Sequence, residues 1–345
     1  MPYKLYKNSS DAWKGMLSAI SSAKKSIYWE VYIFQDDTDP LFSFFDVLEQ
    51  KAKEGIKVVI ILDAFGSYSL SQSTVLRLKD NGVEILFFRQ WLRRVHRKIL
   101  IVDEEIAFLG GVNVAKPYIK WTDLHLRMKN KSVIKSLLWT FSRSYILCGG
   151  KDKELVGIRE KSPSRKTKIW LIDHFPSIGK FLLREYYQEK IAKAKKSIII
   201  VTPYFVPRPW LLKILKVAVL KGVKVQIIIP KNTDIKFMDF VNVVFMRATY
   251  QMGIKFYLGP DYNHSKAMFV DGVEGLIGSN NLDALSFSFN SEASVHFIKK
   301  DMVADLKKVI TEWKKKSTVF KIEDYPFKWY FKPVEWLIHL ISPVL

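Results

Sequence analysis

The stretch "HRKILIVDEEIAFLGGVN" (residues 96–113) recurs as "HSKAMFVDGVEGLIGSNN" (residues 264–281), 168 residues later and without an internal gap. Both copies read H-x-K-x-x-x-x-D, followed by a glycine-containing turn that ends in asparagine. Two other segments recur in the same order at nearly the same offset: "AKKSIYWEVYIF" (23–34) as "AKKSIIIVTPYF" (194–205), and "GIKVVIILD" (55–63) as "GVKVQIIIP" (222–230). Matched segments in one order at one spacing indicate two copies of a single structural unit.

Strand and helix patterns alternate within each copy. In the first copy, "SIYWEVYIF" (26–34) has the composition of a strand, and "LFSFFDVLEQKAKEG" (41–55) is an amphipathic helix that ends in glycine. The following "IKVVIILD" (56–63) is a continuous apolar run, typical of a strand buried on both faces. This order predicts an α/β fold with two tandem lobes, each a mostly parallel sheet flanked by helices.

The predicted organisation divides the chain into four parts. We expect a first lobe over residues 1–150, a polar linker over 151–168, a second lobe over 169–320 and a C-terminal segment over 321–345.

Composition restricts the class of partner. The 345 residues include 55 lysines and arginines against 34 aspartates and glutamates, a formal charge of +21. This excess predicts a polyanionic partner, either nucleic acid or an anionic bilayer, and charge alone does not choose between them. Cys148 is the single cysteine, which excludes an intrachain disulfide and a cysteine zinc site and suits a reducing compartment.

The repeated motif places chemistry on one face of a predicted strand. Because alternate side chains of a strand share a face, His96 and Lys98 point the same way, and the same holds for His264 and Lys266. Each motif also contains an aspartate seven residues after its histidine, on the opposite parity. We expect these two aspartates to be structural supports: Asp103 and Asp271.

The turns that follow each motif add neutral donors. We expect the glycines to let the backbone approach a ligand closely: Gly110, Gly111 and Gly278. Amide and hydroxyl donors beside them come from Asn113, Asn281 and Ser279. Lysine and asparagine around histidine favour a phosphate site. The carboxylate or multi-histidine cluster of a metal site is missing from the pattern, so we expect neither a metal nor a cofactor.

A catalytic histidine needs a group that fixes its tautomer and orientation. Asp123 lies 27 residues after His96, and Glu292 lies 28 residues after His264. Their matched positions make them the candidate orienting carboxylates. Two further residues are supporting candidates: His125, close to Asp123 in sequence, and Glu30, in the first repeated strand.

These motifs resemble those of the phospholipase D superfamily, in which two H-x-K-x-x-x-x-D signatures meet at a pseudo-twofold interface and form one shared active site. The resemblance covers essentially the whole chain. The chain is similar in particular to the bacterial cardiolipin synthase branch. The segments that carry this similarity are "YWEVYIF" (28–34), "LDAFGS" (62–67), "GGVNVA" (110–115), "WTDLHLR" (121–127), "TPYFVP" (202–207) and "GSNNLDALSFSFNSE" (278–292).

The resemblance implies a two-step, metal-independent phosphatidyl transfer through a covalent phosphohistidine. It implies His96 as the nucleophile and His264 as the acid and base, although the near-symmetry of the motifs leaves the reverse assignment open. It also implies that the carboxylates pair across the lobes, Glu292 with His96 and Asp123 with His264. The motif lysines and asparagines would hold the phosphoryl oxygens. With phosphatidylglycerol as donor and acceptor, the products are cardiolipin and glycerol.

Two alternatives stay open at this stage. The first is the same chemistry with water as acceptor, which gives a phospholipase D or a nuclease that acts on DNA. The second is a catalytically silent binding protein that kept the fold. Thr122 and Leu285 stand where many synthases of this branch carry arginine, which leaves the acceptor alcohol undetermined.

The C-terminal segment "YPFKWYFKPVEWLIHLISPVL" (325–345) combines aromatic rings with lysines. Such residues favour the headgroup boundary of an anionic bilayer, so an interfacial anchor is expected. The residues are Lys328, Trp329, Tyr330, Phe331 and Trp336. The alternative is a terminal helix docked on the second lobe. We therefore expect a peripheral protein on the cytoplasmic face of a bacterial cell membrane, with phosphatidylglycerol as substrate, nucleic acid disfavoured and the oligomeric state undetermined.

Overall fold

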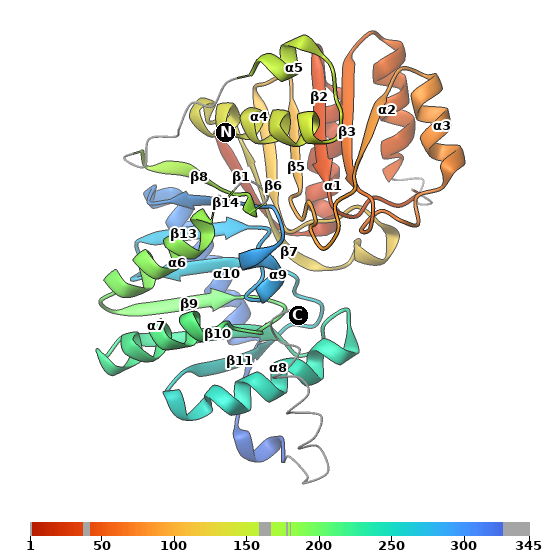
Figure 1. Cartoon of the computed structure of the whole chain (residues 1–345). Helices are drawn as coiled ribbons and strands as arrows, with labels where there is room; N and C mark the ends of the chain where they lie inside the picture. Colours follow the sequence, from red (N-terminus) through yellow and green to blue (C-terminus); the bar gives the residue numbers. More distant parts are fainter. Residues whose placement is uncertain (1, 37–41, 159–166, 177–178, 180, 327–345) are drawn as a thin grey trace.

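The computed structural model describes residues 2–36, 42–158, 167–176, 179 and 181–326. Two lobes lie side by side, the amino-terminal one coloured red to yellow-green and the carboxy-terminal one green to blue (Figure 1). Each lobe contains one sheet with helices packed on it.

The amino-terminal lobe contains a seven-stranded sheet in the order β1-β7-β6-β5-β2-β3-β4. Its elements are β1 (Tyr3–Asn8), α1 (Ser9–Ser21), β2 (Ser26–Val31), α2 (Phe44–Lys53), β3 (Lys57–Asp63), α3 (Gln72–Asp80), β4 (Glu84–Phe88), β5 (Ile99–Val102), β6 (Ile106–Gly110), β7 (Thr122–Met128), α4 (Lys131–Leu147) and α5 (Lys153–Gly157). A 3₁₀ turn, η2 (Lys116–Tyr118), lies between β6 and β7.

The carboxy-terminal lobe repeats this plan, with the strand order β8-β14-β13-β12-β9-β10-β11 and an added edge strand, β15. Its elements are β8 (Ile169–His174), α6 (Leu182–Lys193), β9 (Ser197–Val201), α7 (Pro209–Leu220), β10 (Lys224–Pro230), α8 (Lys236–Thr249), β11 (Lys255–Gly259), β12 (Ala267–Val270), β13 (Glu274–Gly278), α9 (Ala284–Ser288), β14 (Glu292–Phe297), α10 (Lys300–Lys315) and β15 (Thr318–Val319). The identical order of seven strands confirms the duplication predicted from the repeated segments.

Both sheets are mixed, and the expectation of mostly parallel sheets is wrong in this detail. Among the strands of the described residues, β2, β3 and β4 in the first lobe and β9, β10 and β11 in the second pair in parallel. The other pairs are antiparallel, because β5 and β6, and likewise β12 and β13, are joined by three-residue turns. A parallel neighbour would need a crossover of a dozen or more residues. The predicted α/β class with two tandem lobes is confirmed.

One hydrophobic cluster extends across both lobes, and each lobe also has a cluster of its own. Helices α1, α2 and α3 cover one face of the first sheet, and α6, α7 and α8 cover the corresponding face of the second. The remaining faces carry α4 and α10, and their buried side chains, such as Phe141 and Trp313, belong to one cluster with strand residues of both lobes. Burial of this cluster fixes the lobes against each other.

Both predicted connecting regions contain packed structure. Helix α5 lies within the predicted linker, where Leu155 is buried and its carbonyl accepts a 2.6 Å hydrogen bond from the Ser142 hydroxyl. The predicted C-terminal segment begins with a 3₁₀ turn, η5 (Ile322–Asp324), and Tyr325 stacks on Phe320 at 5.0 Å.

The predicted interfacial residues lie outside the described residues: Lys328, Trp329, Tyr330, Phe331 and Trp336. None of the helices in the described part of the chain is long and apolar enough to cross a bilayer.

Candidate active site

A cleft of about 1000 Å³ opens where the lobes meet, and both copies of the repeated motif contribute to its lining. The contributions from the motifs are His96 and Asn113 from the first lobe and His264 and Asn281 from the second. Aromatic rings form much of the remaining wall: Tyr32, Tyr118, Trp121, Tyr204 and Tyr262. The structure therefore brings together residues 168 positions apart in the chain, as a shared site requires.

His96 pairs with a carboxylate of the other lobe. Its Nδ1 lies 3.0 Å from Oε1 of Glu292, the first residue of β14. Two backbone hydrogen bonds set this distance, because the His96 amide donates to the Ser291 carbonyl at 3.0 Å and the Ser291 amide donates to the Arg94 carbonyl at 2.8 Å. The carboxylate is thus placed by the same inter-lobe bridge that places the histidine.

His264 has the reciprocal arrangement. Its Nδ1 lies 3.0 Å from Oδ2 of Asp123 on β7, and its amide donates a 2.8 Å hydrogen bond to the Thr122 carbonyl. In both dyads Nδ1 faces the carboxylate, which leaves Nε2 as the nitrogen available to a substrate. The cross-lobe pairing implied by the resemblance is present in the geometry.

The two carboxylates have different environments. Glu292 accepts hydrogen bonds from the hydroxyls of Ser279 and, at 2.9 Å, Ser286, whereas Asp123 accepts one from the amide of Leu124 at 2.7 Å. Burial favours the neutral form of Glu292, but neighbouring His96 and Lys98, together with the hydroxyl of Ser279, lower its pKa to about 2. Glu292 is therefore a fixed anion across the physiological pH range.

The glycines of the two turns have a different purpose from the one expected. A Cβ on Gly110 would lie 2.2 Å from the Leu124 carbonyl oxygen, and one on Gly278 would lie 1.9 Å from the Ser294 hydroxyl. These glycines therefore allow close approach of β7 and β14, the strands that carry the carboxylates. The contacts are with these strands, whereas we expected the glycines to let the backbone approach a ligand. A Cβ on Gly111 would lie 2.2 Å from Oδ1 of Asp123 itself. Asp123, the shorter acid, thus lies against Gly111. Glu292, the longer acid, is bonded to Ser279, which holds the matching position in the second copy.

The motif lysines lie beneath the histidines. Lys98 Nζ donates a 2.7 Å hydrogen bond to the His96 carbonyl, and Lys266 Nζ donates to the His264 carbonyl. Both are almost fully buried, and neither is among the residues that line the cleft. Burial lowers the pKa of Lys98 to about 7 and that of Lys266 to about 8. A phosphate in the cleft would favour their charged forms, so both lysines are suited to respond to an anion.

Burial lowers the pKa of both histidines and so favours their neutral forms before substrate binds. Burial, opposed in part by Glu292, lowers the pKa of His96 to about 4. Burial and the charge of Lys266 also lower the pKa of His264. A neutral imidazole with Nδ1–H held by a carboxylate presents a free electron pair on Nε2, which is the form that a nucleophile or a general base requires.

Asp103 and Asp271 bind backbone amides away from the cleft. Oδ1 of Asp103 accepts from the amides of Lys24, Lys25 and Ser26 at 2.7–3.1 Å. Asp271 accepts in the same way from the matched segment, with distances of 2.7–2.9 Å to the amides of residues 195–197. Each aspartate thus ties the β5–β6 or β12–β13 turn to the start of the first parallel strand, which explains why "AKKS" is repeated together with the motif.

Asp271→Ala should lower the free energy of unfolding by about 1–3 kcal/mol, because three amides lose a charged acceptor. The specific activity of the folded protein should stay within about twofold, since Asp271 is remote from the cleft lining. Urea unfolding followed by circular dichroism, with activity normalised to folded protein, measures both. Asp80→Ala, at an exposed acid that ends α3, is the control and should leave both unchanged. Loss of activity at full stability would contradict the supporting role.

Two supporting candidates lie behind the site. His125 stacks against Phe108 and packs over Gly110, and burial lowers its pKa to about 4. Glu30 forms a buried ion pair with Arg97, with 3.0 Å between Oε1 and Nε. Neither His125 nor Glu30 lines the cleft. Strand β7 directs His125 into the lobe, and Glu30 is bonded to Arg97, which points away from its neighbours His96 and Lys98. Arg97 also contacts Asp173 of the second lobe, so Glu30 supports the interface between lobes.

Residues missed from the sequence include Ser286 and the rings beside the histidines. Tyr32 lies edge-on to His96 with 4.7 Å between ring centroids, and Trp121 lies 5.4 Å from His264. Both rings belong to segments that carry the family resemblance, 28–34 and 121–127, and that membership was the available signal. Ser286 has no counterpart in the first copy, and no repeat could have identified it. Leu285 lines the cleft, whereas Thr122 contributes its backbone to the inter-lobe bridge.

No group of three or more histidine, cysteine, aspartate and glutamate side chains that could hold a metal ion occurs within the described ranges.

Comparison with known proteins agrees with this geometry. A family described as "Cardiolipin synthase, PLD-like domain" matches residues 16–145 and 187–313, which include both motifs. A probable cardiolipin synthase of Bacillus subtilis (strain 168) is 30% identical over 88% of this chain and 64% of its own length. A cardiolipin synthase of Clostridium perfringens (strain SM101 / Type A) is 28% identical over 99% of this chain and 76% of its own. The chain thus spans somewhat less than two thirds of the first relative.

The fold also matches a solved structure. The crystal structure of phosphatidylserine synthase from Haemophilus influenzae Rd KW20 superimposes with a TM-score of 0.78 at 15% sequence identity. The match covers 100% of this chain and 95% of that one, so the arrangement of both lobes is common to the two proteins.

Proposed function

Because the chain belongs to the cardiolipin synthase family of phospholipase D-like proteins, we propose that it is a phosphatidyltransferase that condenses two molecules of phosphatidylglycerol into cardiolipin and glycerol. One observation carries the proposal: two histidines, each paired through Nδ1 with a carboxylate of the opposite lobe, line a single cleft. Two poised imidazoles on one cleft suit a double displacement, in which one bonds to phosphorus and the other moves protons.

In the first step, Nε2 of His96 attacks the phosphorus of bound phosphatidylglycerol. The negative charge of the bound phosphodiester favours the protonated form of His264. The bond from phosphorus to the headgroup oxygen breaks, and His264 gives that oxygen its proton, so glycerol leaves. The phosphatidyl group stays on His96, whose ring now carries positive charge. Glu292 is the better partner for that charge, because hydroxyls of Ser279 and Ser286 hold it as an anion. This environment favours His96 as the nucleophile.

In the second step, a headgroup hydroxyl of another phosphatidylglycerol enters the cleft. Neutral His264 accepts its proton while the oxygen attacks phosphorus, and the bond to His96 breaks. Asp123 stabilises the imidazolium that forms on His264 in this step. The enzyme returns to its starting state, with His264 again protonated for the next departure of glycerol.

The motif lysines and asparagines stabilise negative charge on the phosphoryl oxygens. Lys98 and Lys266 lie beneath the histidines, where a bound phosphate would favour their charged forms and the low dielectric of their buried positions would strengthen the attraction. Asn113 and Asn281 line the cleft beside the histidines and offer amide donors.

The proposed location is the cytoplasmic face of a bacterial membrane, where phosphatidylglycerol is available. The net charge of +21 supports attachment to an anionic bilayer.

Incubating purified protein with phosphatidylglycerol vesicles and EDTA, followed by mass spectrometry of the lipids, tests the proposal. We expect cardiolipin and glycerol in equal amounts, unaffected by EDTA. Phosphatidic acid as the sole product would identify a hydrolase, and absence of lipid turnover together with cleavage of single-stranded DNA would identify a nuclease. Either result would overturn the transferase proposal.

A further inference from the structure

We propose that exposed apolar side chains around the mouth of the cleft form the face by which this protein docks on an anionic phospholipid bilayer. The inference rests on the proposed function, because a substrate embedded in a bilayer has to enter the cleft from the membrane surface. We call this surface the docking face, and its apolar members are Phe65, Tyr68, Trp91, Leu92, Ile235 and Phe237.

The docking face is built from loops at one edge of both sheets. Phe65 and Tyr68 follow β3, Trp91 and Leu92 follow β4, and Ile235 and Phe237 lie where the loop after β10 enters α8. The carboxyl ends of the parallel strands in each lobe therefore supply all of them. Phe65, Tyr68 and Ile235 also line the cleft, so the exposed apolar surface is continuous with the site.

The turn that carries Trp91 and Leu92 is costly for a soluble protein. Trp91 is 89% exposed and Leu92 60% exposed, at the tip of a turn closed by the bridge between Gln90 and Arg93. Leu92 has a φ of 58°, a left-handed conformation that branched apolar residues rarely adopt and that glycine or asparagine would accept. A turn that served only to connect elements would favour those residues, so the exposed Trp-Leu pair indicates contact with an apolar medium.

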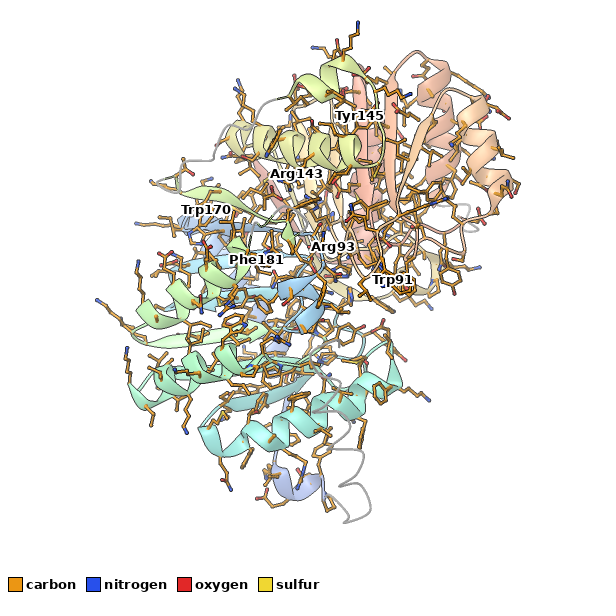
Figure 2. All side chains as sticks on the ribbon, in the orientation of Figure 1. Trp91, Arg93, Arg143, Tyr145, Trp170 and Phe181 are labelled. Carbon is orange, nitrogen blue, oxygen red and sulfur yellow. The ribbon has the colours of Figure 1, made fainter. Side chains whose placement is uncertain are left out.

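The loops are held together before any contact is made. The buried carboxylate of Asp63 accepts from the amides of Phe65 and Gly66 at 3.0 and 2.9 Å, and from the Val95 amide at 2.8 Å. The guanidinium of Arg94 lies 4.4 Å from the centroid of the Phe65 ring. The loop after β3 and the loop after β4 thus form one preorganised surface, and Figure 2 shows Trp91 and Arg93 at the lower edge of the amino-terminal lobe.

Charge around the mouth selects an anionic surface. The exposed bases in the loops that border the cleft are Arg89, Arg93, Lys116, Lys120, Lys231 and Lys236. Asp234 is an exposed acid of the loop after β10, and Asp261 is an exposed acid of the loop after β11. Aromatic and aliphatic tips among lysines and arginines match the boundary between headgroups and acyl chains. Aliphatic Leu92 and Ile235 have no base-stacking face, which favours a bilayer over a nucleic acid.

Sedimentation with vesicles of equal parts phosphatidylglycerol and phosphatidylcholine tests the docking face. The inactive His96→Gln chain is used as the background, so that lipid is bound without turnover. Trp91→Ser with Leu92→Asn should weaken vesicle binding on the order of tenfold or more, because two apolar side chains no longer leave water. The asparagine suits the left-handed turn, so the fold should be retained.

The matched control is Leu220→Ser with Val273→Asn, which changes two residues that are 77% and 59% exposed at the opposite edge of the second lobe. It should bind as the parent does. With His96 restored, the Trp91 and Leu92 variant should retain turnover of a short-chain phosphatidylglycerol dispersed as monomers and lose turnover of vesicles. If the parent protein shows no lipid turnover but its vesicle binding still depends on Trp91 and Leu92, the proposed function is contradicted and the docking face is supported.

Three results would overturn the docking face. The first is vesicle binding by the Trp91 and Leu92 variant equal to that of the control. The second is binding that depends on residues 327–345 alone. The third is single-stranded DNA binding that exceeds vesicle binding and is lost in the same variant, which would assign the surface to nucleic acid.

Discussion

Replacing His96 or His264 by glutamine should each lower the rate of cardiolipin formation on the order of 10⁴-fold or more, because neither step proceeds without both imidazoles. The double variant should be no slower than the single ones, since residues that act as one unit do not contribute additively. Steady-state assays with phosphatidylglycerol vesicles, monitored by mass spectrometry, measure the rates.

His296→Gln is the matched control. His296 lies on β14, four residues after Glu292, and is buried against Tyr186, to which its Nδ1 is hydrogen bonded at 2.8 Å. Its replacement should leave the rate per folded molecule within about threefold, as expected for a residue outside the cleft lining. Retention of a tenth or more of the parent rate by either cleft histidine variant would contradict the shared site.

Glu292→Gln should lower the rate by about 10²- to 10⁴-fold, because the histidine then loses the anion that fixes its tautomer. Hydroxyls of Ser279 and Ser286 already donate to this carboxylate. Because these two hydroxyls donate to different oxygens, Oε2 and Oε1, the NH₂ of glutamine takes the place of one of them, and both places lie within 3.2 Å of Nδ1 of His96. Nδ1 would then accept a hydrogen bond, the proton would move to Nε2, and the nucleophilic electron pair would be lost.

Ser286→Ala is the graded comparison for this change. It removes one donor and leaves the anion, so we expect a loss of about tenfold or less. Thermal unfolding of both variants separates a catalytic loss from a folding defect. A Glu292→Gln protein that is folded and as active as the Ser286→Ala protein would show that the carboxylate charge is dispensable.

The repeated stretches predicted the duplication and identified the histidines and carboxylates that the structure pairs, because each of these lies at a matched position. His96 and His264 are recognisable from the doubled motif, and Asp123 and Glu292 from nearly equal distances downstream. The parity of Asp103 and Asp271 also indicated a role away from the cleft, where the structure places them on backbone amides.

The repeated sequence could not predict the direction of neighbouring strands or how the side chains beneath the cleft are placed. The sheets are mixed because short turns after Val102 and Val270 return the chain antiparallel, and strand composition alone does not reveal this. Spacing predicts that Lys98 shares a face with His96, but not that its ammonium group folds under the histidine carbonyl. Gly111 lies against Asp123, a contact between segments that no local pattern specifies.

A burst assay with a phosphatidyl ester of p-nitrophenol tests the division of labour between the two histidines. This leaving group departs without a proton, so formation of the phosphohistidine no longer needs His264, whereas the next step still needs it as a base. His264→Gln should therefore release one p-nitrophenol per chain and then stall, and His96→Gln should release none. Two equivalents per chain, a burst from His96→Gln, or no burst from either variant would contradict a single site with His96 as its nucleophile.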